Sequence, residues 1–188
     1  MTDNIQQPSP ARDLRSLLER SRERLDLDAV DRQILMALYE DSRISQRSLA
    51  AKVGMSAPAV AERISRLERA EVIKRHTIEV DWDAVGYPML VVMPLTFSAG
   101  ADVLAVVTTL RSIPELVELT VLTGSYDMMA RFRVKDHVDL QNLLLEHIWP
   151  IPGLQRVETM LSLGQISNKS PLVRLLNPEA TTHSTDDQ

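Results

Sequence analysis

Residues 44–69 of this 188-residue chain read ISQRSLAAKVGMSAPAVAERISRLER, and they decide how its N-terminal part folds. Ser45 is placed to cap a short helix that Gly54 ends, because Gly readily adopts the left-handed conformation that follows a helix. Ser56 is placed to cap a second helix. The apolar side of this second helix recurs at helical spacing, at Val60, Ile64 and Leu67. Two helices joined by a tight turn predict a helix-turn-helix whose second helix reads DNA.

Another helix precedes this motif, and an alternating segment follows it. Asp28 is placed to cap the preceding helix, which we expect to end near Asp41. Residues 72–80 alternate between apolar and polar side chains, which suits a short strand pair or a wing. Residues 26–80 are therefore predicted to form a winged helix-turn-helix domain.

Positive charge gathers around the motif. The whole chain has a net charge of −5, yet residues 43–75 hold eight Lys and Arg against three Glu. Charges at helical spacing are often only the solvated side of a helix, but their place after a capped turn favours contact with DNA. We predict base contacts by Ser56, Ala57, Ala59 and Arg63, and phosphate contacts by Arg47, Arg66 and Lys74.

The side chains at the tip of the second helix are small. Alanines and one serine hydroxyl offer methyl groups and a single polar atom to base edges, whereas Arg63 is the candidate for guanine. Helical spacing predicts that the cations of this helix lie on the side that points away from its core. These side chains predict that the helix discriminates modestly between bases, and that sequence specificity depends partly on how easily the DNA deforms.

Residues 89–165 follow a different pattern, in which strands and helices alternate. Strands are predicted at 89–97, 115–122, 128–134 and 155–163, and helices at 103–110 and 138–149. This βαββαβ order predicts a ferredoxin-like domain, so the whole chain is of the α+β class. Pro94 interrupts the first strand with a missing N–H, so we expect a bulge or a local break there. Residues 81–88 are predicted to be a linker, and residues 166–188 an extended segment followed by a disordered tail.

Composition excludes several classes of site. The chain has no Cys, which rules out disulfides and thiolate chemistry, and its histidines have no metal-like grouping with carboxylates, so neither a metal nor another cofactor is expected. The N-terminus resembles no secretory signal and no apolar run approaches the roughly 20 residues of a spanning helix, so a cytoplasmic protein without membrane contact is predicted. Residues 1–25 are expected to be an extension, disordered and then briefly helical, that serves as a solvated tail, a helix on a partner subunit or a basic arm on DNA.

Five stretches of the chain form a recognisable series, in this order: LDAVDRQILMALYEDSRIS (27–45), SLAAKVGMS (48–56), RISRLERAEVIKR (63–75), VGY (85–87) and TGSYDMM (123–129). Together they resemble the Lrp/AsnC family of leucine-responsive and asparagine-synthetase regulators. The resemblance covers about residues 26–165. It implies a winged helix-turn-helix on double-stranded DNA, a homodimer formed through the βαββαβ sheets, often with four dimers in a disc, and an amino acid or related small molecule as effector.

The resemblance also implies where the effector binds. The family uses the turn that matches Thr123, Gly124, Ser125, Tyr126 and Asp127 here. Backbone N–H groups of such a turn can hold a carboxylate while an Asp receives an ammonium, although Asp127 could instead only cap the turn. Two departures stand out: Glu71 replaces the family's usual Gly before the wing, and Met128 with Met129 follows Asp127, which leaves the ligand's identity open.

Two alternatives compete with a DNA-binding regulator. Sirohaem decarboxylases resemble the same family, and such an enzyme would draw on His76 and Arg131. An effector-binding module without DNA function is the other, but the intact caps Ser45 and Ser56 speak against it. A regulator without enzymatic activity is the prediction.

Overall fold

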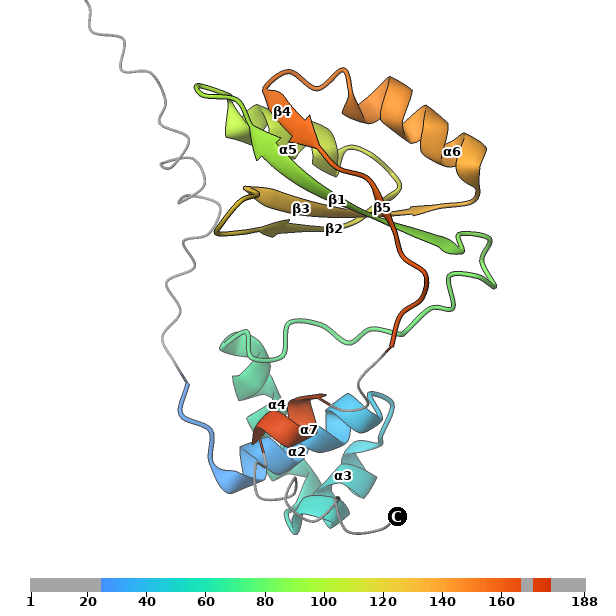
Figure 1. Ribbon diagram of the computed structural model, residues 1–188. Coiled ribbons are helices and arrows are strands. Elements are labelled where there is room, and N and C mark those ends of the chain that lie inside the picture. Colours follow the sequence, from blue (N-terminus) through green and yellow to red (C-terminus); the bar gives the residue numbers. More distant parts are fainter. Residues whose placement is uncertain (1–24, 167–170, 177–188) are drawn as a thin grey trace, which may run out of the picture. The chain divides into compact units, whose positions relative to one another are not determined.

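The computed structural model describes residues 25–166 and 171–176, so the predictions for the N-terminal extension and for the tail after residue 177 lie outside the described residues. The chain divides into two compact units, one of residues 80–165 and the other of residues 25–79 together with residue 166 and residues 171–176 (Figure 1). In the described part of the chain, no helix is both long enough and apolar enough to cross a membrane.

Three capped helices form the helix-turn-helix, which confirms the predicted motif. They are α2 (Ala29–Glu40), α3 (Gln46–Val53) and α4 (Ala57–Arg69). The side chains of Asp28, Ser45 and Ser56 each accept a backbone N–H of the first helical turn. Gly54 ends α3 with φ 68°, in the left-handed region that only Gly enters without strain. The three helices close over a core of fully or nearly fully buried apolar side chains, among them Ile34, Leu49, Val60 and Leu67.

The segment after α4 begins with a strained residue and forms no strand. Glu71, where the family usually has Gly, adopts φ 54°. Of the strand pair or wing expected at residues 72–80, the strand pair is wrong, because these residues carry no strand in the structure. Alternation alone does not make a strand, since a strand also needs a partner for its backbone groups. Ile73 packs against the core of the helix-turn-helix instead.

A short C-terminal helix was not predicted. Residues 171–176 form α7 (Pro171–Leu176), which contacts α2. Its Leu172 and Leu176 pack against the core of the helix-turn-helix. After the second unit, the chain therefore adds a further helix to the unit that contains the helix-turn-helix.

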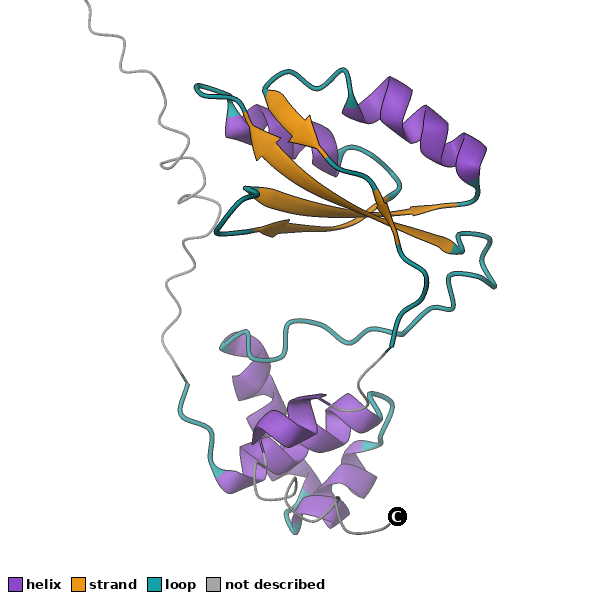
Figure 2. Cartoon of the chain, in the orientation of Figure 1, coloured by secondary structure: helices purple, strands orange, loops and turns teal. Residues whose placement is uncertain are grey.

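The second unit is a ferredoxin-like sheet with two helical segments, as predicted. Its elements in chain order are β1 (Met89–Phe97), α5 (Val103–Arg111), β2 (Leu116–Val121), β3 (Met128–Val134), α6 (His137–Asn142), η1 (Leu143–Ile148), β4 (Leu154–Val157) and β5 (Met160–Leu161). The antiparallel strands lie in the order β2, β3, β1, β4, and β5 also pairs with β1. Both helical segments cover one face of the sheet (Figure 2).

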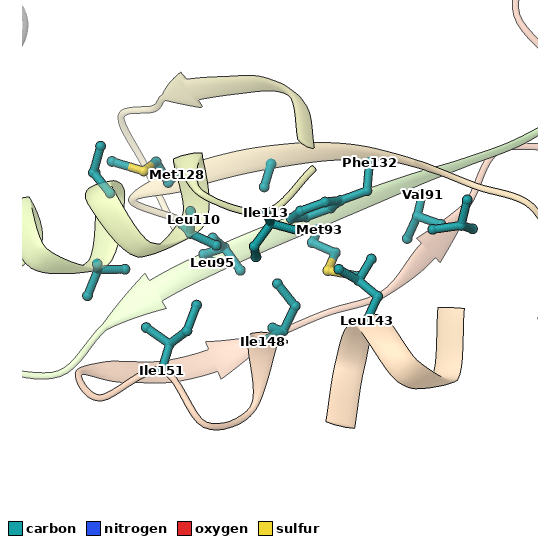
Figure 3. Close-up of a cluster of buried hydrophobic side chains, with 14 of the residues drawn as sticks. Val91, Met93, Leu95, Leu110, Ile113, Met128, Phe132, Leu143, Ile148 and Ile151 are labelled. Atoms are coloured by element: carbon teal, nitrogen blue, oxygen red, sulfur yellow. The ribbon is translucent and has the colours of Figure 1, made fainter. Parts of the chain in front are cut away.

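The core of this unit lies between that face and the helices. Alternate residues of β1 and β3 point into it, including Val91, Met93, Leu95, Met128 and Phe132 (Figure 3). Leu110 of α5 and Ile148 of η1 close the core from the helical side. The clean period of two in the sequence of β3 predicted its buried face correctly.

The strand that contains Pro94 is continuous, whereas the strand beside it is divided into β4 and β5. β1 continues through Pro94, which pairs with Met129 of β3. On the other side of β1, the partner strand breaks between β4 and β5, and the N–H of Glu158 donates to the carbonyl of Pro94 at 3.1 Å. N–H and C=O of one residue point to the same side of a strand, so the missing N–H of Pro94 faces this break. The break expected in the strand of Pro94 is therefore absent from β1, and the interruption lies in the partner strand instead.

Candidate DNA-binding surface and effector turn

The N-terminal half of α4 presents small side chains, as the sequence indicates. Ser56 is exposed, but its hydroxyl already accepts the N–H of Ala59 at 3.4 Å as the helix cap. Ala57 and Ala59 are half-buried, and Ala57 also packs against the core of the helix-turn-helix. The structure thus brings these three predicted residues together at the tip of the helix, with less free surface than the sequence suggested.

Arg63 and Arg66 do not point away from the core, so that expectation is corrected. The Nη1 of Arg63 lies 2.8 Å from Oδ1 of Asp31 and 2.6 Å from Oδ2 of Asp28. The guanidinium of Arg66 donates through Nη2 to Oδ2 of Asp31. Asp31 is fully buried, so the two arginines fold back across α2 to reach it. A helical wheel misses this because a long Arg side chain can reach a buried carboxylate from the flank of its helix.

The cluster of Asp28, Asp31, Arg63 and Arg66 is electrically balanced, with two carboxylates and two guanidinium groups. The backbone N–H of Asp31, followed by the Arg63 guanidinium, lowers the pKa of Asp28 below its ordinary value of 3.8. The carboxylates of Asp28 and then Asp31 raise the pKa of Arg63. The sequence pattern indicated Asp28 only as a helix cap, and it did not indicate that Asp31 binds the two arginines. The spacing Asp-x-x-Asp is the signal, since the two also form a reciprocal capping box.

The other cations of this unit divide into paired and unpaired groups. Arg69 pairs with Glu62 at 2.9 Å, and Lys52 pairs with Glu40 at 3.4 Å. Arg47 and Lys74, both predicted to hold phosphates, are exposed and form no ion pair with the residues that the structure describes. Arg43 and Arg75 are likewise exposed and without an ion pair among the described residues, so these four cations are available to an approaching phosphate.

The predicted effector turn lies between β2 and β3. Thr123, Gly124 and Ser125 are exposed, whereas Tyr126 and Asp127 are half-buried. Gly124 adopts φ 120°, which the backbone of this turn requires and which other residues rarely adopt. The sequence therefore placed this turn correctly between its two strands.

Asp127 ties the turn to the end of β1. Its Oδ2 accepts the N–H of Phe97 at 2.8 Å, and its own N–H donates to the carbonyl of Leu95 at 2.9 Å. The side chain thus bonds a strand 30 positions earlier in the chain and does not only cap its own turn. The pairing of β1 with β3 ends at Leu95 and Met128, so Asp127 satisfies the N–H of Phe97 just beyond the end of that ladder.

Tyr126 faces the end of β4. Arg156 lies over its ring, 5.8 Å from the centroid, and also forms an ion pair with Glu158. A hydrogen bond from the Tyr126 hydroxyl to Glu158 raises the pKa of Tyr126 above its ordinary value of 10.0. The turn is thereby bordered by one guanidinium and one carboxylate that the sequence did not identify.

A hollow of about 350 Å³ opens on the helical side of this unit. Its walls come from the loop after β1, the first turns of α5 and the residues just before β4: Ser98, Ala99, Gly100, Ala101, Asp102, Ala105, Val106, Thr109, Ile151, Pro152 and Gly153. None of the five residues of the predicted effector turn lines it. No sequence pattern indicates this hollow, because its lining is mostly apolar and comes from separate segments of the chain.

Arg133 differs from its neighbour Arg131 on the same face of β3. Arg131 is exposed and pairs with Glu118 at 3.0 Å. Arg133 is only 9% exposed, since it lies over the ring of Trp82 at 5.5 Å and donates to the carbonyl of Pro88 at 3.2 Å and to the amide oxygen of Gln165. The alternation of side chains along β3 predicted that both arginines lie on the outer face of the sheet. It did not predict that residues of the connector would cover Arg133.

Comparisons with known proteins agree with this arrangement. A family model of winged helix-turn-helix DNA-binding domains matches residues 27–74, and a model of the Lrp/AsnC ligand binding domain matches residues 91–172. The chain is 34% identical over 140 residues to the HTH-type transcriptional regulator FL11 of Pyrococcus horikoshii, which covers 74% of this chain and 91% of that protein. It is 31% identical over 150 residues to the leucine-responsive regulatory protein of Escherichia coli, with 79% and 92% covered.

A solved structure shares the fold. The complex of a transcriptional regulator from Neisseria meningitidis with L-Met superposes with a TM-score of 0.73 at 21% identity, over 76% of this chain and 94% of that one. The helix-turn-helix, the ligand-binding domain and the relatives together make this protein a DNA-binding transcriptional regulator. The chain belongs to the Lrp/AsnC family.

Proposed function

We propose that this regulator binds DNA through the tip of α4 and the cations around it, and that an amino acid or a related small molecule controls this binding from the second unit. The observation that carries the proposal is the capped helix-turn-helix, with its tip residues together and its unpaired cations Arg47 and Lys74 exposed. The L-Met complex of the Neisseria regulator supports an amino acid as effector.

Two kinds of DNA contact are proposed. Arg47 and Lys74 hold phosphates, since each is an exposed cation with its charge uncompensated by the described residues. Ser56, Ala57 and Ala59 lie against base edges, with alanine methyl groups suited to thymine. Arg63 and Arg66 remain part of the proposed surface, the first toward a base and the second toward a phosphate, each with one edge of its guanidinium committed to α2.

The phosphate contacts predict a specific response to salt. Arg47→Gln should weaken binding of every duplex alike and make the slope of log K against log salt shallower by about 1, because one fewer phosphate is neutralised. Fluorescence anisotropy with labelled duplexes at several KCl concentrations measures both. Arg111→Gln, the same charge change at an exposed position of α5, is the matched control and should leave the slope unchanged. A wild-type protein that shifts no duplex, even at low salt, contradicts the proposed function.

The effector is proposed to bind at the turn 123–127, with backbone N–H groups toward a carboxylate and Asp127 toward an ammonium. Screening the amino acids by thermal shift should find one that raises the unfolding midpoint, because a ligand of the folded state stabilises it. Asp127→Asn removes the charge but keeps an oxygen that can accept the N–H of Phe97, so this variant should fold and lose the shift. Asp136→Asn, at the cap of α6, should keep it. An undiminished shift in Asp127→Asn would place the effector elsewhere.

Assembly is proposed to follow the family, as a homodimer formed through the sheets and further into an octamer. Met160 and Leu161 of the short strand β5 are 46% and 44% exposed, and apolar side chains on a strand favour burial by a partner. Sedimentation at several protein concentrations, with and without the amino acid found by the screen, gives the subunit number. A monomer at every concentration would contradict this assembly.

We also propose that the protein is not an enzyme and acts in the cytoplasm. The enzyme alternative would use His76 and Arg131 at a substrate, but His76 lies 3.3 Å from Glu68 and Arg131 pairs with Glu118 at 3.0 Å. A coloured tetrapyrrole that copurifies with the protein would argue for the enzyme.

A further inference from the structure

We propose that Asp31 is a positioning residue that decides how the reading helix uses Arg63 and Arg66. It fixes the two guanidinium groups and compensates their charge, so Arg63 contacts a base and Arg66 one phosphate at fixed places, while the pair adds little to the general attraction for DNA. This inference rests on the proposed DNA-binding surface. It assigns a DNA-related role to a supporting-helix residue that has no exposed surface of its own.

The geometry around Asp31 uses both of its oxygens. Oδ1 accepts Arg63 Nη1 at 2.8 Å, and Oδ2 accepts Arg66 Nη2 together with the backbone N–H of Asp28 at 3.2 Å. The carboxylate is fully buried, where a charge is stable only when it is paired and hydrogen-bonded. Charge-assisted hydrogen bonds of this kind are stronger than neutral ones, so both arginines are held closely.

The two arginines differ from ordinary surface cations in freedom as well as in charge. The Arg63 side chain is 27% exposed and that of Arg66 is 42% exposed, and Arg66 Nε is buried. An unrestrained surface Arg loses much rotamer entropy when it grips a phosphate, whereas these two have already lost it on folding. Held arginines therefore suit readout at a fixed place on the DNA.

Charge balance determines what such arginines do to affinity. Binding to any sequence grows with the number of phosphates that net positive charge neutralises, and this number sets the salt dependence. Asp28 and Asp31 cancel both arginines, so the reading helix attracts arbitrary DNA less than its sequence suggests. The ratio of specific to random affinity is therefore larger, because the affinity for any duplex is reduced while the directional contacts to the specific duplex remain.

Removing the carboxylate charge should reverse this balance. In Asp31→Asn the side chain keeps its size and one acceptor, but one positive charge on α4 is no longer compensated. We expect the slope of log K against log salt to steepen by about 1 and the affinity for a random duplex to rise several-fold. The ratio of specific to random affinity should fall. A residue that served only the fold would move neither the salt slope nor this ratio.

The experiment compares the full-length wild type with variants by fluorescence anisotropy. The probes are a duplex that the wild type selects from a random pool and a shuffled duplex of the same composition, each titrated at KCl concentrations from about 50 to 200 mM. Asp26→Asn, at an exposed carboxylate before α2, makes the same charge change away from the arginines and should behave as wild type. The double variant Asp31→Asn with Arg66→Gln restores the balance and should return the slope to the wild-type value.

A second variant covers the case in which Asp31→Asn fails to fold. Asp28→Asn acts on a half-exposed residue that also pairs with Arg63, and Asn caps helices as well as Asp does. It should steepen the slope in the same direction. If the wild type binds DNA but folded Asp28→Asn and Asp31→Asn keep its slope and its discrimination, the role of Asp31 is refuted while the proposed function stands. A wild type that binds no DNA would refute the proposed function itself.

Discussion

At the scale of single residues, Glu71 adopts a backbone conformation that favours glycine. It holds φ 54°, a conformation that costs a residue with a side chain roughly 1–2 kcal/mol. Comparing Glu71→Gly with Glu71→Ala isolates this cost, because both lose the same side-chain contacts. Urea denaturation should find the Gly variant more stable than the Ala variant by about 1 kcal/mol. Equal stabilities would mean that the turn relaxes to another conformation when the side chain is removed.

At the scale of elements, α7 is a small helix that stabilises a unit to which it is not adjacent in the sequence. Leu172 and Leu176 pack on the helix-turn-helix core, whereas Leu175 is 78% exposed. Replacing both packed leucines by Ser should lower the free energy of unfolding of this unit by about 1–3 kcal/mol, because each is only partly buried. Hydrogen exchange of the α2 amides measures the change. Leu175→Ser, on the same helix, should change it by less than about 0.5 kcal/mol. Equal effects of the two variants would show that α7 does not pack in solution.

At the scale of the whole molecule, Arg133 holds both chain segments that lead toward the DNA-binding unit. It contacts Trp82 and the Pro88 carbonyl on one segment and Gln165 on the other. Arg133→Met removes the hydrogen bond to the Pro88 carbonyl, worth roughly 1 kcal/mol, and the cation–π contact with Trp82, worth about 0.5 kcal/mol, so the connector should open about tenfold more often. Chymotrypsin, which cleaves after aromatic residues such as Trp82, reports this opening as faster cleavage. Arg131→Met, which loses only an exposed ion pair, should be cleaved at the wild-type rate. Unchanged cleavage in Arg133→Met would show that the connector is held by other contacts.

Local features of this protein followed from the sequence alone. The caps Asp28, Ser45 and Ser56, the αL stop at Gly54 and the buried face of β3 depend on residues within a few positions of one another. Backbone hydrogen bonds and side-chain periodicity act over that same range, so the order of elements and the ferredoxin-like topology were predictable. The location of the effector turn between two strands followed in the same way.

Partners distant in the sequence were decided by the tertiary structure. Arg63 and Arg66 meet Asp31 across 32 and 35 positions, Arg133 meets Gln165 across 32, and α7 reaches α2 from the other end of the chain. A long cationic side chain looks the same in a sequence whether it will face phosphate or a buried carboxylate. Packing decides between them, because only a folded core brings a desolvated carboxylate within reach, and such a carboxylate requires a cation. The sequence thus determined that this chain has a helix-turn-helix, and the tertiary structure determined which charges of α4 are already paired within the protein.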